Sequence, residues 1–155
     1  MLLYTDKMYL LEGESNICVY NDTCDDYMKE YKILFCAVTK AIVNGTVYNV
    51  IIGDSNFEKL ENKIQSFLLN HEIGHIKHDH LTGLDEQSSK QLTLKRFLGF
   101  LPKMEIEADC YAASVVGIKD AKYSLLWFVK NKNLPFITRF ECLKRYIRIK
   151  EVPLG

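Results

Sequence analysis

The sequence has few features of secreted, membrane-spanning or nucleic-acid-binding proteins. Its five cysteines are scattered and form no CxxC pair, which predicts reduced thiols in a cytosolic-type compartment. The longest clean apolar run, residues 33–38, is too short to span a bilayer, and the N-terminus lacks the continuous apolar region of a signal peptide. Twenty basic residues cancel twenty acidic ones, so charge favours neither nucleic acid nor an anionic membrane as partner. We therefore expect a cytoplasmic protein without a membrane span or a nucleic-acid partner.

The length and composition predict one folded domain. A chain of 155 residues with 48% apolar side chains can bury a sizeable core and is unlike a disordered protein. We predict an α+β fold over residues 1–155. Residues 1–56 are expected to be mainly β and to form a small antiparallel sheet, and residues 57–150 are expected to be mainly α.

The β part is predicted from a turn signal. The Asn-Gly pair at 44–45 separates two runs rich in β-branched and aromatic residues. Such a pair accepts the positive φ angles of a tight turn, so residues 32–43 and 46–52 are expected to form a hairpin. Helical apolar spacing over residues 24–41 leaves a helix there as the alternative.

Before this hairpin the signal is weaker. Residues 8–11 and 17–20 have the composition of short strands, and residues 21–26 (NDTCDD) are typical of a turn or loop.

A long helix is expected over residues 57–78. Ser55 or Asn56 can cap it, and its apolar stripe continues into histidines, which indicates a buried helix. A loop over residues 79–87 is expected to follow it. Four further helices are predicted over residues 88–100, 104–116, 120–130 and 135–150. The expected inward faces are Tyr123, Leu126, Trp127 and Val129 or Lys130 in the third of these, and Ile137, Phe140, Leu143 and Ile147 in the last.

The four histidines of the chain lie together in the segment HEIGHIKHDH, residues 71–80. His71 and His75 are one helical turn apart, so both imidazoles leave the same face and can grip one metal ion. Glu72 lies next to His71, where it can act on water bound to that metal. This His-Glu-x-x-His pattern is typical of zinc hydrolases.

A catalytic zinc site usually takes three protein ligands, and the segment MEIEAD supplies candidates for the third. Glu105 and Asp109 are four residues apart and share one helix face, which suits one ligand and one residue that orients a ligating histidine. Glu107 is about 200° round the helix from Glu105, so we prefer Glu105 as the ligand.

Together, the runs HEIGH and EIEADCYAASVVG resemble the gluzincin class of zinc metallopeptidases. Within it they are similar to the soluble catalytic core of HtpX-like and CAAX-prenyl-protease-like peptidases, and the ImmA/IrrE-type regulatory peptidases are close in pattern. The resemblance covers about residues 57–131. It implies a zincin-like fold and one zinc ion held by His71, His75 and Glu105. It also implies that Glu72 is the general base and that Asp109 supports a ligating histidine.

The sequence also departs from that pattern. HtpX-like enzymes have transmembrane segments, which this chain lacks. Where many members carry a His-Pro pair before the last helix, this chain has Leu134-Pro135. Arg139, Arg145 or Tyr146 are candidates for stabilising the oxyanion of the transition state, although each is better explained as a solvated or packing residue.

The two remaining histidines are secondary candidates. His78 is about 20° round the helix from His71 and could approach the metal site, but a histidine at a helix C-terminus is also favoured by the helix dipole. His80 is expected in a loop.

The function predicted from these patterns is zinc-dependent endopeptidase activity on a protein or peptide substrate. The strand at 46–52 could pair with an extended substrate, or it could be an ordinary hairpin arm. The alternative is a catalytically inactive module in which zinc only stabilises the fold.

Overall fold

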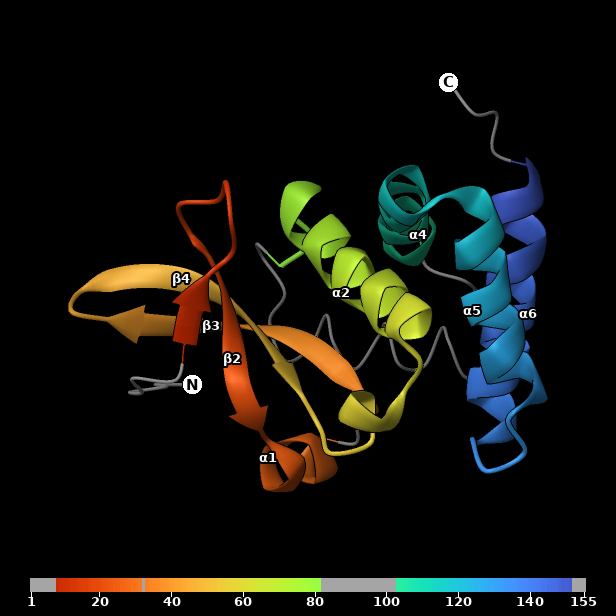
Figure 1. Ribbon diagram of the computed structural model, residues 1–155, viewed down its shortest axis with the longest axis horizontal. Coiled ribbons are helices and arrows are strands. Elements are labelled where there is room, and N and C mark those ends of the chain that lie inside the picture. The colour runs from red at the N-terminus through yellow and green to blue at the C-terminus, as the bar shows by residue number, and fades with distance from the viewer. Residues whose placement is uncertain (1–7, 32, 82–102, 152–155) are drawn as a thin grey trace. The chain divides into compact units, whose positions relative to one another are not determined.

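The computed structural model describes residues 8–31, 33–81 and 103–151, and these form an α+β protein. The described elements are one four-stranded mixed sheet and five α-helices (Figure 1). The chain divides into two compact units, Met1–Glu61 and Asn62–Gly155. The first unit holds the sheet and the first helix, and the second unit holds the other four described helices.

The first unit contains β1 (Met8–Leu10), β2 (Ile17–Thr23), α1 (Asp25–Glu30), β3 (Cys36–Val43) and β4 (Thr46–Gly53). The predicted hairpin is confirmed: β3 and β4 pair antiparallel from Cys36–Gly53 to Val43–Thr46. Asn44 and Gly45 have φ angles of 50° and 79°, as a tight two-residue turn requires. The alternative helix over residues 24–41 is wrong for the strand residues, and only its start corresponds to a helix, α1.

The sheet is mixed, so the expectation of an antiparallel sheet is wrong at one pairing. The strand order is β1-β2-β4-β3, and β2 runs parallel to β4. After β2 the chain passes through α1 and β3 before it returns as β4, and such a crossover is what allows two strands to lie parallel. The hairpin signal specified how β3 joins β4, but not which strand β4 would meet on its other side.

The core of the first unit lies between α1 and the sheet. Met28 of α1 packs with Cys18, Ala41, Val50 and Ile52 of three strands, and all five are buried. The predicted turn over residues 21–26 is wrong at both ends, because β2 continues to Thr23 and α1 begins at Asp25.

The long helix begins later than predicted. Asp54 accepts hydrogen bonds from the backbone N–H groups of Phe57 (2.9 Å) and Phe35 (3.0 Å). The first of these closes a short 3-10 turn over Phe57–Lys59, and Leu60 is then extended with ψ 153°. Asn56 is the N-cap residue of this turn but makes no side-chain cap bond, and Asp54 supplies the side-chain acceptor instead. The extended Leu60 prevents a continuous helix from residue 57.

The second unit contains α2 (Asn62–Lys77), α4 (Lys103–Val116), α5 (Ile118–Lys130) and α6 (Phe136–Glu151). α2 packs against α4 and α5, and α6 packs against α4 and α5. Gly117, with a φ of 90°, separates α4 from α5. The helix predicted over residues 88–100 lies outside the described residues.

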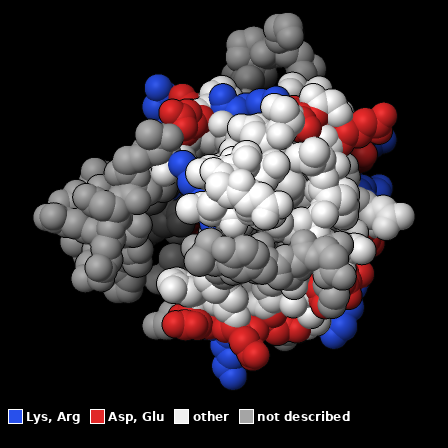
Figure 2. Space-filling view, turned by 90° about the vertical axis from the view of Figure 1, so that its left-hand side faces the viewer, with Lys and Arg blue, Asp and Glu red and all other residues white. Residues whose placement is uncertain are grey.

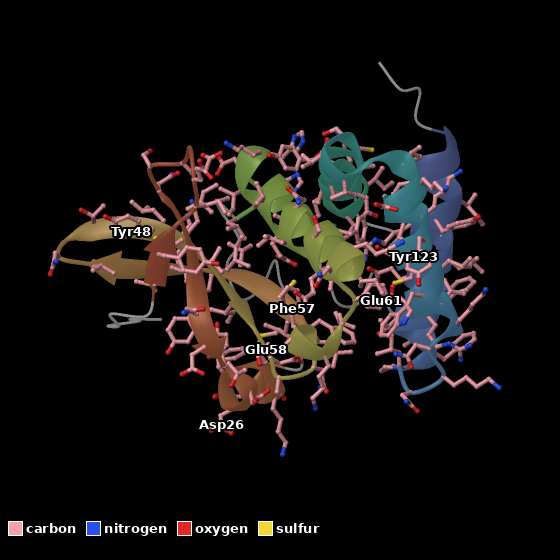
Figure 3. All side chains as sticks on the ribbon, in the orientation of Figure 1. Asp26, Tyr48, Phe57, Glu58, Glu61 and Tyr123 are labelled. Carbon is pink, nitrogen blue, oxygen red and sulfur yellow. The ribbon has the colours of Figure 1, made fainter. Side chains whose placement is uncertain are left out.

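Two of the predicted inward faces are wrong. In α5 the buried residues are Ala121, Ser124, Leu125 and Phe128. Of the predicted residues, Leu126, Trp127 and Val129 are half-buried, and Tyr123 (labelled in Figure 3) is exposed. The ammonium of Lys63 lies 4.5 Å from the ring centroid of Tyr123. In α6 the predicted apolar residues Ile137, Phe140, Leu143 and Ile147 are all exposed.

The inward face of α6 instead carries Cys142, Arg145 and Ile149. Arg145 forms an ion pair with the buried carboxylate of Asp109 in α4. The ion pair with Asp109, rather than the most apolar stripe of α6, therefore determines which face of this helix is turned inward.

The exterior fits the balanced composition. On the face shown in Figure 2, basic and acidic side chains both lie around an uncharged central area. Within the described ranges, no helix is long and apolar enough to cross a membrane.

Candidate metal centre

α2 places His71 and His75 on its buried side. Ile64, Phe67, His71 and His75 follow each other at helical spacing, and all four are buried, as predicted. The two imidazole rings are 4.7 Å apart between centroids and nearly perpendicular, at 87°. Their Nε2 atoms are 3.1 Å apart, so both rings direct the same nitrogen to one point.

A glycine lets the second helix approach. A Cβ atom on Gly74 would stand 2.9 Å from both the Cα and the carbonyl oxygen of Ala108 in α4, closer than real Cβ contacts. Gly74 therefore allows the backbones of α2 and α4 to touch. The carboxylates of Glu105 and Asp109, on the same face of α4 as Ala108, then reach the histidines of α2.

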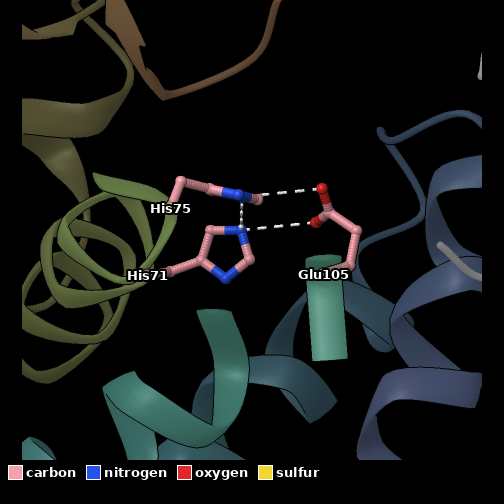
Figure 4. Close-up of side chains that lie close together, drawn as sticks. All are labelled: His71, His75 and Glu105. Carbon is pink, nitrogen blue, oxygen red and sulfur yellow. Dashed lines mark hydrogen bonds and ion pairs between the residues drawn. The ribbon is translucent and has the colours of Figure 1, made fainter. Parts of the chain in front are cut away.

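Glu105 completes a set of three donor atoms (Figure 4). Its Oε2 is 3.3 Å from Nε2 of His71, and its Oε1 is 3.6 Å from Nε2 of His75. Zinc bonds to nitrogen and oxygen of about 2.0–2.1 Å in a tetrahedron imply donor atoms about 3.3–3.4 Å apart. The observed separations of 3.1, 3.3 and 3.6 Å fit this edge length.

The donor set is also largely removed from solvent. His71, Glu105 and His75 are 5%, 6% and 9% exposed. Two imidazoles and one carboxylate are ligands that zinc commonly takes, and they leave one place for water. All three donor atoms of this group are nitrogen or oxygen, and none is a cysteine sulfur.

Asp109 orients His71 from the side opposite the donor set. Its Oδ1 lies 2.8 Å from Nδ1 of His71, so that nitrogen donates the hydrogen bond and Nε2 faces the metal position. Arg145 of α6 donates to both oxygens of the same carboxylate, from Nη2 to Oδ1 at 2.6 Å and from Nε to Oδ2 at 2.7 Å. Arg145 is therefore held in a two-point ion pair and is not a solvated residue, as its side-chain exposure of 11% shows.

The charges around Asp109 shift the pKa values of its neighbours. Burial and Arg145 both lower the pKa of His71, but the hydrogen bonds to Asp109 and Glu105 outweigh them and raise it to about 9. Burial raises the pKa of Asp109, but Arg145 outweighs this effect and keeps the carboxylate ionised. Because Nδ1 of His71 donates to Asp109, the approach of Arg145 Nη2 to that nitrogen at 3.2 Å is a contact and not a hydrogen bond.

His75 has the opposite electrostatic environment. Burial lowers its pKa to about 4, and the neighbouring His71 contributes in the same direction. The metal-free cluster therefore holds one protonated and one neutral imidazole at neutral pH. A metal ion needs both of them neutral, so its binding must displace the proton of His71.

His80 is the residue that sequence patterns did not assign to the site. Its Nδ1 lies 2.9 Å from Nδ1 of His75, and its Nε2 lies 2.9 Å from Oε2 of Glu107. Glu107 thus points away from the three donor atoms, as predicted, and pairs with His80 and with Lys103 at 3.2 Å. His80, Glu107 and the exposed His78 form a second group whose donor atoms lie close enough to hold a metal ion.

The remaining predicted residues lie in other environments. Glu72 is half-buried on α2 beside His71. His78 follows the last residue of α2, and its ring stacks on that of His80, with 5.5 Å between the ring centroids. The Nε of Arg139 donates to the carbonyl of Val129 at 2.9 Å, near the C-terminus of α5. Tyr146 is half-buried, and the centroid of its ring lies 6.0 Å from the ammonium of Lys122.

Comparison with known proteins gives no independent assignment. No protein-family model, no curated protein and no solved structure matches the chain. The assignment of a function therefore depends on the geometry of the site.

Proposed function

We propose that the protein is a zinc-dependent endopeptidase of the gluzincin type, with His71, His75 and Glu105 as ligands and Glu72 as the general base. The observation that carries the proposal is the triangle of donor atoms, whose edges of 3.1, 3.3 and 3.6 Å match a tetrahedral zinc site. A coincidental group of buried polar residues would have no reason to direct three ligand atoms to one point.

The hydrogen bond from His71 to Asp109 supports the same proposal. Histidine ligands of zinc commonly donate their other ring nitrogen to a carboxylate, which fixes the tautomer and the ring orientation. The 2.8 Å contact from Nδ1 of His71 provides this here. Arg145 keeps Asp109 ionised, so the acceptor persists at neutral pH.

Each part of the site has a chemical role in peptide hydrolysis. His71, His75 and Glu105 would hold the zinc ion, which would supply Lewis-acid chemistry toward a peptide carbonyl and an attacking water near neutral pH. The carboxylate of Glu72 takes the proton from the attacking water and then delivers it to the nitrogen of the leaving amine. With the metal bound, His71 would have lost its proton, and both histidines would be neutral and hold their Nε2 atoms at the donor positions.

The test compares wild-type protein with Glu72→Gln, both purified without added metal. Each is expected to contain one zinc ion, because Glu72 is not a ligand. Cleavage of a mixed peptide library should fall by about 10²–10⁴-fold in the variant, and a chelator should abolish wild-type cleavage. A wild-type protein without zinc, or a Glu72→Gln variant that cleaves as fast as wild type, would contradict the proposal.

The same experiment separates catalysis from a purely structural metal. If both proteins bind zinc, neither cleaves any peptide and the chelator lowers the melting temperature, the site is a structural one in an inactive module.

A further inference from the structure

The last turn of α2 has a hydrogen-bond pattern that returns the chain to His75. The N–H of His80 donates to the carbonyl of His75 at 2.9 Å, and the N–H of Asp79 donates to that of Ile76 at 3.1 Å. Asp79 has a φ of 55°. This pair of bonds around a left-handed residue is a Schellman motif, in which the second residue after the C-cap residue packs on the third residue from the helix end.

In most proteins that contact is hydrophobic, but here it joins two histidines. His75 and His80 occupy the two positions that the motif brings together, and their Nδ1 atoms are 2.9 Å apart. The short loop after the helix thus folds back and presents a polar ring to a candidate metal ligand.

The protons along this contact can be assigned from their neighbours. Nε2 of His80 lies 2.9 Å from the carboxylate of Glu107, which can only accept, so this nitrogen carries the proton. A hydrogen bond between the two Nδ1 atoms needs one donor and one acceptor, so with the proton of His80 on Nε2, its Nδ1 accepts from Nδ1–H of His75. That leaves Nε2 of His75 unprotonated and directed at Glu105 and His71.

We propose that His80 is a positioning residue that, together with Glu107, fixes His75 in the tautomer and orientation that bind the metal through Nε2. The inference deepens the proposed function and rests on its metal site. Asp109 contacts His71 directly through one hydrogen bond. Glu107 supports His75 indirectly, through a chain of two hydrogen bonds that passes through His80. In this way α4 fixes both histidines, the second through His80, which lies beyond the end of α2.

The competing role for His80 is as a ligand of a second metal ion, with His78 and Glu107. The two roles demand different protonation. A metal on Nε2 of His80 would move its proton to Nδ1, and His75 would then have to accept there and carry its own proton on Nε2. His80 carries its proton on Nε2 if it positions His75, and on Nδ1 if it binds a second metal ion through Nε2. The two roles therefore exclude each other and give opposite experimental results.

The first experiment measures zinc affinity by competition with a chromophoric chelator. The central variant is His80→Phe, which keeps a ring but has no nitrogen. His80→Asn places a carbonyl oxygen near the position of Nδ1 and keeps an acceptor for His75. His78→Phe is the matched control, since it removes a histidine whose ring stacks on His80 and leaves both nitrogens of the His75–His80 hydrogen bond in place.

We expect about a 10-fold loss of zinc affinity in His80→Phe, within the range found when residues that hold metal ligands are replaced. His80→Asn should recover most of the affinity, and His78→Phe should bind one zinc ion as tightly as wild type. Unchanged affinity in His80→Phe would overturn the inference. So would two zinc ions per wild-type chain with one lost in His78→Phe, because His80 would then be a ligand.

A second measurement needs no variant. Long-range ¹⁵N–¹H NMR of the zinc-loaded wild type reports which ring nitrogen of each histidine carries a proton. The expected tautomers are Nδ1–H for His75 and Nε2–H for His80, and a proton on Nδ1 of His80 would contradict the role. Absence of zinc from the wild type would instead refute the proposed function, whereas wild-type zinc with unaffected His80 variants would refute only this inference.

Discussion

Gly74 of α2 and Ala108 of α4 lie so close that a single methyl group cannot fit between them. A Cβ on Gly74 would be 2.9 Å from the Cα and the carbonyl oxygen of Ala108, and 3.1 Å from the Cβ of Tyr111. The first two atoms belong to the backbone, which cannot move aside as a flexible side chain can. This approach sets the distance between the histidines of α2 and the carboxylates of α4.

Gly74→Ala should therefore weaken zinc binding although no ligand is changed. Alanine favours a helix by about 1 kcal/mol over glycine, so helix propensity alone would make the variant more stable. We expect the opposite, a loss of about 1–3 kcal/mol from overpacking, together with at least a 10-fold loss of zinc affinity. Chemical denaturation and chelator competition measure the two effects.

Asn70→Ala, on the same helix, is the control for Gly74→Ala and should keep wild-type affinity. A Gly74→Ala protein that binds zinc like wild type would show that the spacing of α2 and α4 does not matter.

Arg145→Met should destabilise the protein strongly. It leaves the buried carboxylate of Asp109 without its two-point partner, and removing one member of a buried ion pair typically costs about 3–5 kcal/mol. Urea unfolding followed by circular dichroism measures the loss. Arg139→Met is the control, because its guanidinium contacts a backbone carbonyl rather than a buried charge. If the two variants lost the same free energy of unfolding, the ion pair between Arg145 and Asp109 would not be what stabilises the fold here.

The stability of the metal-free protein should depend on pH through two histidines. The folded pKa of His71, about 9, is above the ordinary value of 6.5, so its contribution is complete below pH 6.5 and is lost as the pH rises through 9. The folded pKa of His75, about 4, is below 6.5, so stability is lost as the pH falls from 6.5 through 4. These two groups therefore place maximal stability near pH 6.5.

Between pH 6.5 and 9, the stability of the metal-free protein can be compared with that of the metal-loaded protein. Complete loss of the His71 contribution corresponds to roughly 3 kcal/mol. Zinc displaces the proton of His71, so the loaded protein should show no such decrease between pH 6.5 and 9. Urea unfolding of both forms across this range measures it. A parallel decrease in the two forms would show that His71 is not a metal ligand.

Gly45→Ala should destabilise the hairpin, whereas Gly45→Asn should be tolerated. Gly45 has a φ of 79°, and a Cβ added there would meet no atom within 4 Å, so only the backbone angle opposes a larger residue. Alanine in the left-handed region costs about 1–2 kcal/mol, and asparagine costs less. Melting temperatures of the two variants decide this, and equal values would mean that the turn relaxes to another geometry.

Local patterns in the sequence were sufficient for several parts of the structure. Asn44-Gly45 specified the β3–β4 hairpin because that pair accepts the required φ angles. The spacing of His71 and His75 placed both rings on one helix face, and the spacing of Glu105 and Asp109 did the same for the carboxylates. These predictions depend only on the geometry of one element, which neighbouring residues determine.

Long-range contacts decided the rest. No local pattern indicated that β4 would lie parallel to β2, or that α6 would turn Arg145 inward and leave Ile137 and Phe140 exposed. Helix rotation depends on which partner a face meets, and a buried carboxylate on α4 outweighed the apolar stripe.

In the segment from His71 to His80, local spacing likewise determined some features and long-range contacts determined others. Its sequence by itself determined that two histidines share a face beside Glu72. The spacing on α4 also favoured Glu105 over Glu107, but only the tertiary structure brought Glu105 within 3.3 Å of His71 and folded His80 back onto His75 and Glu107. The first result needs only the helix repeat, whereas the second needs the close approach of two helices and the left-handed turn at Asp79.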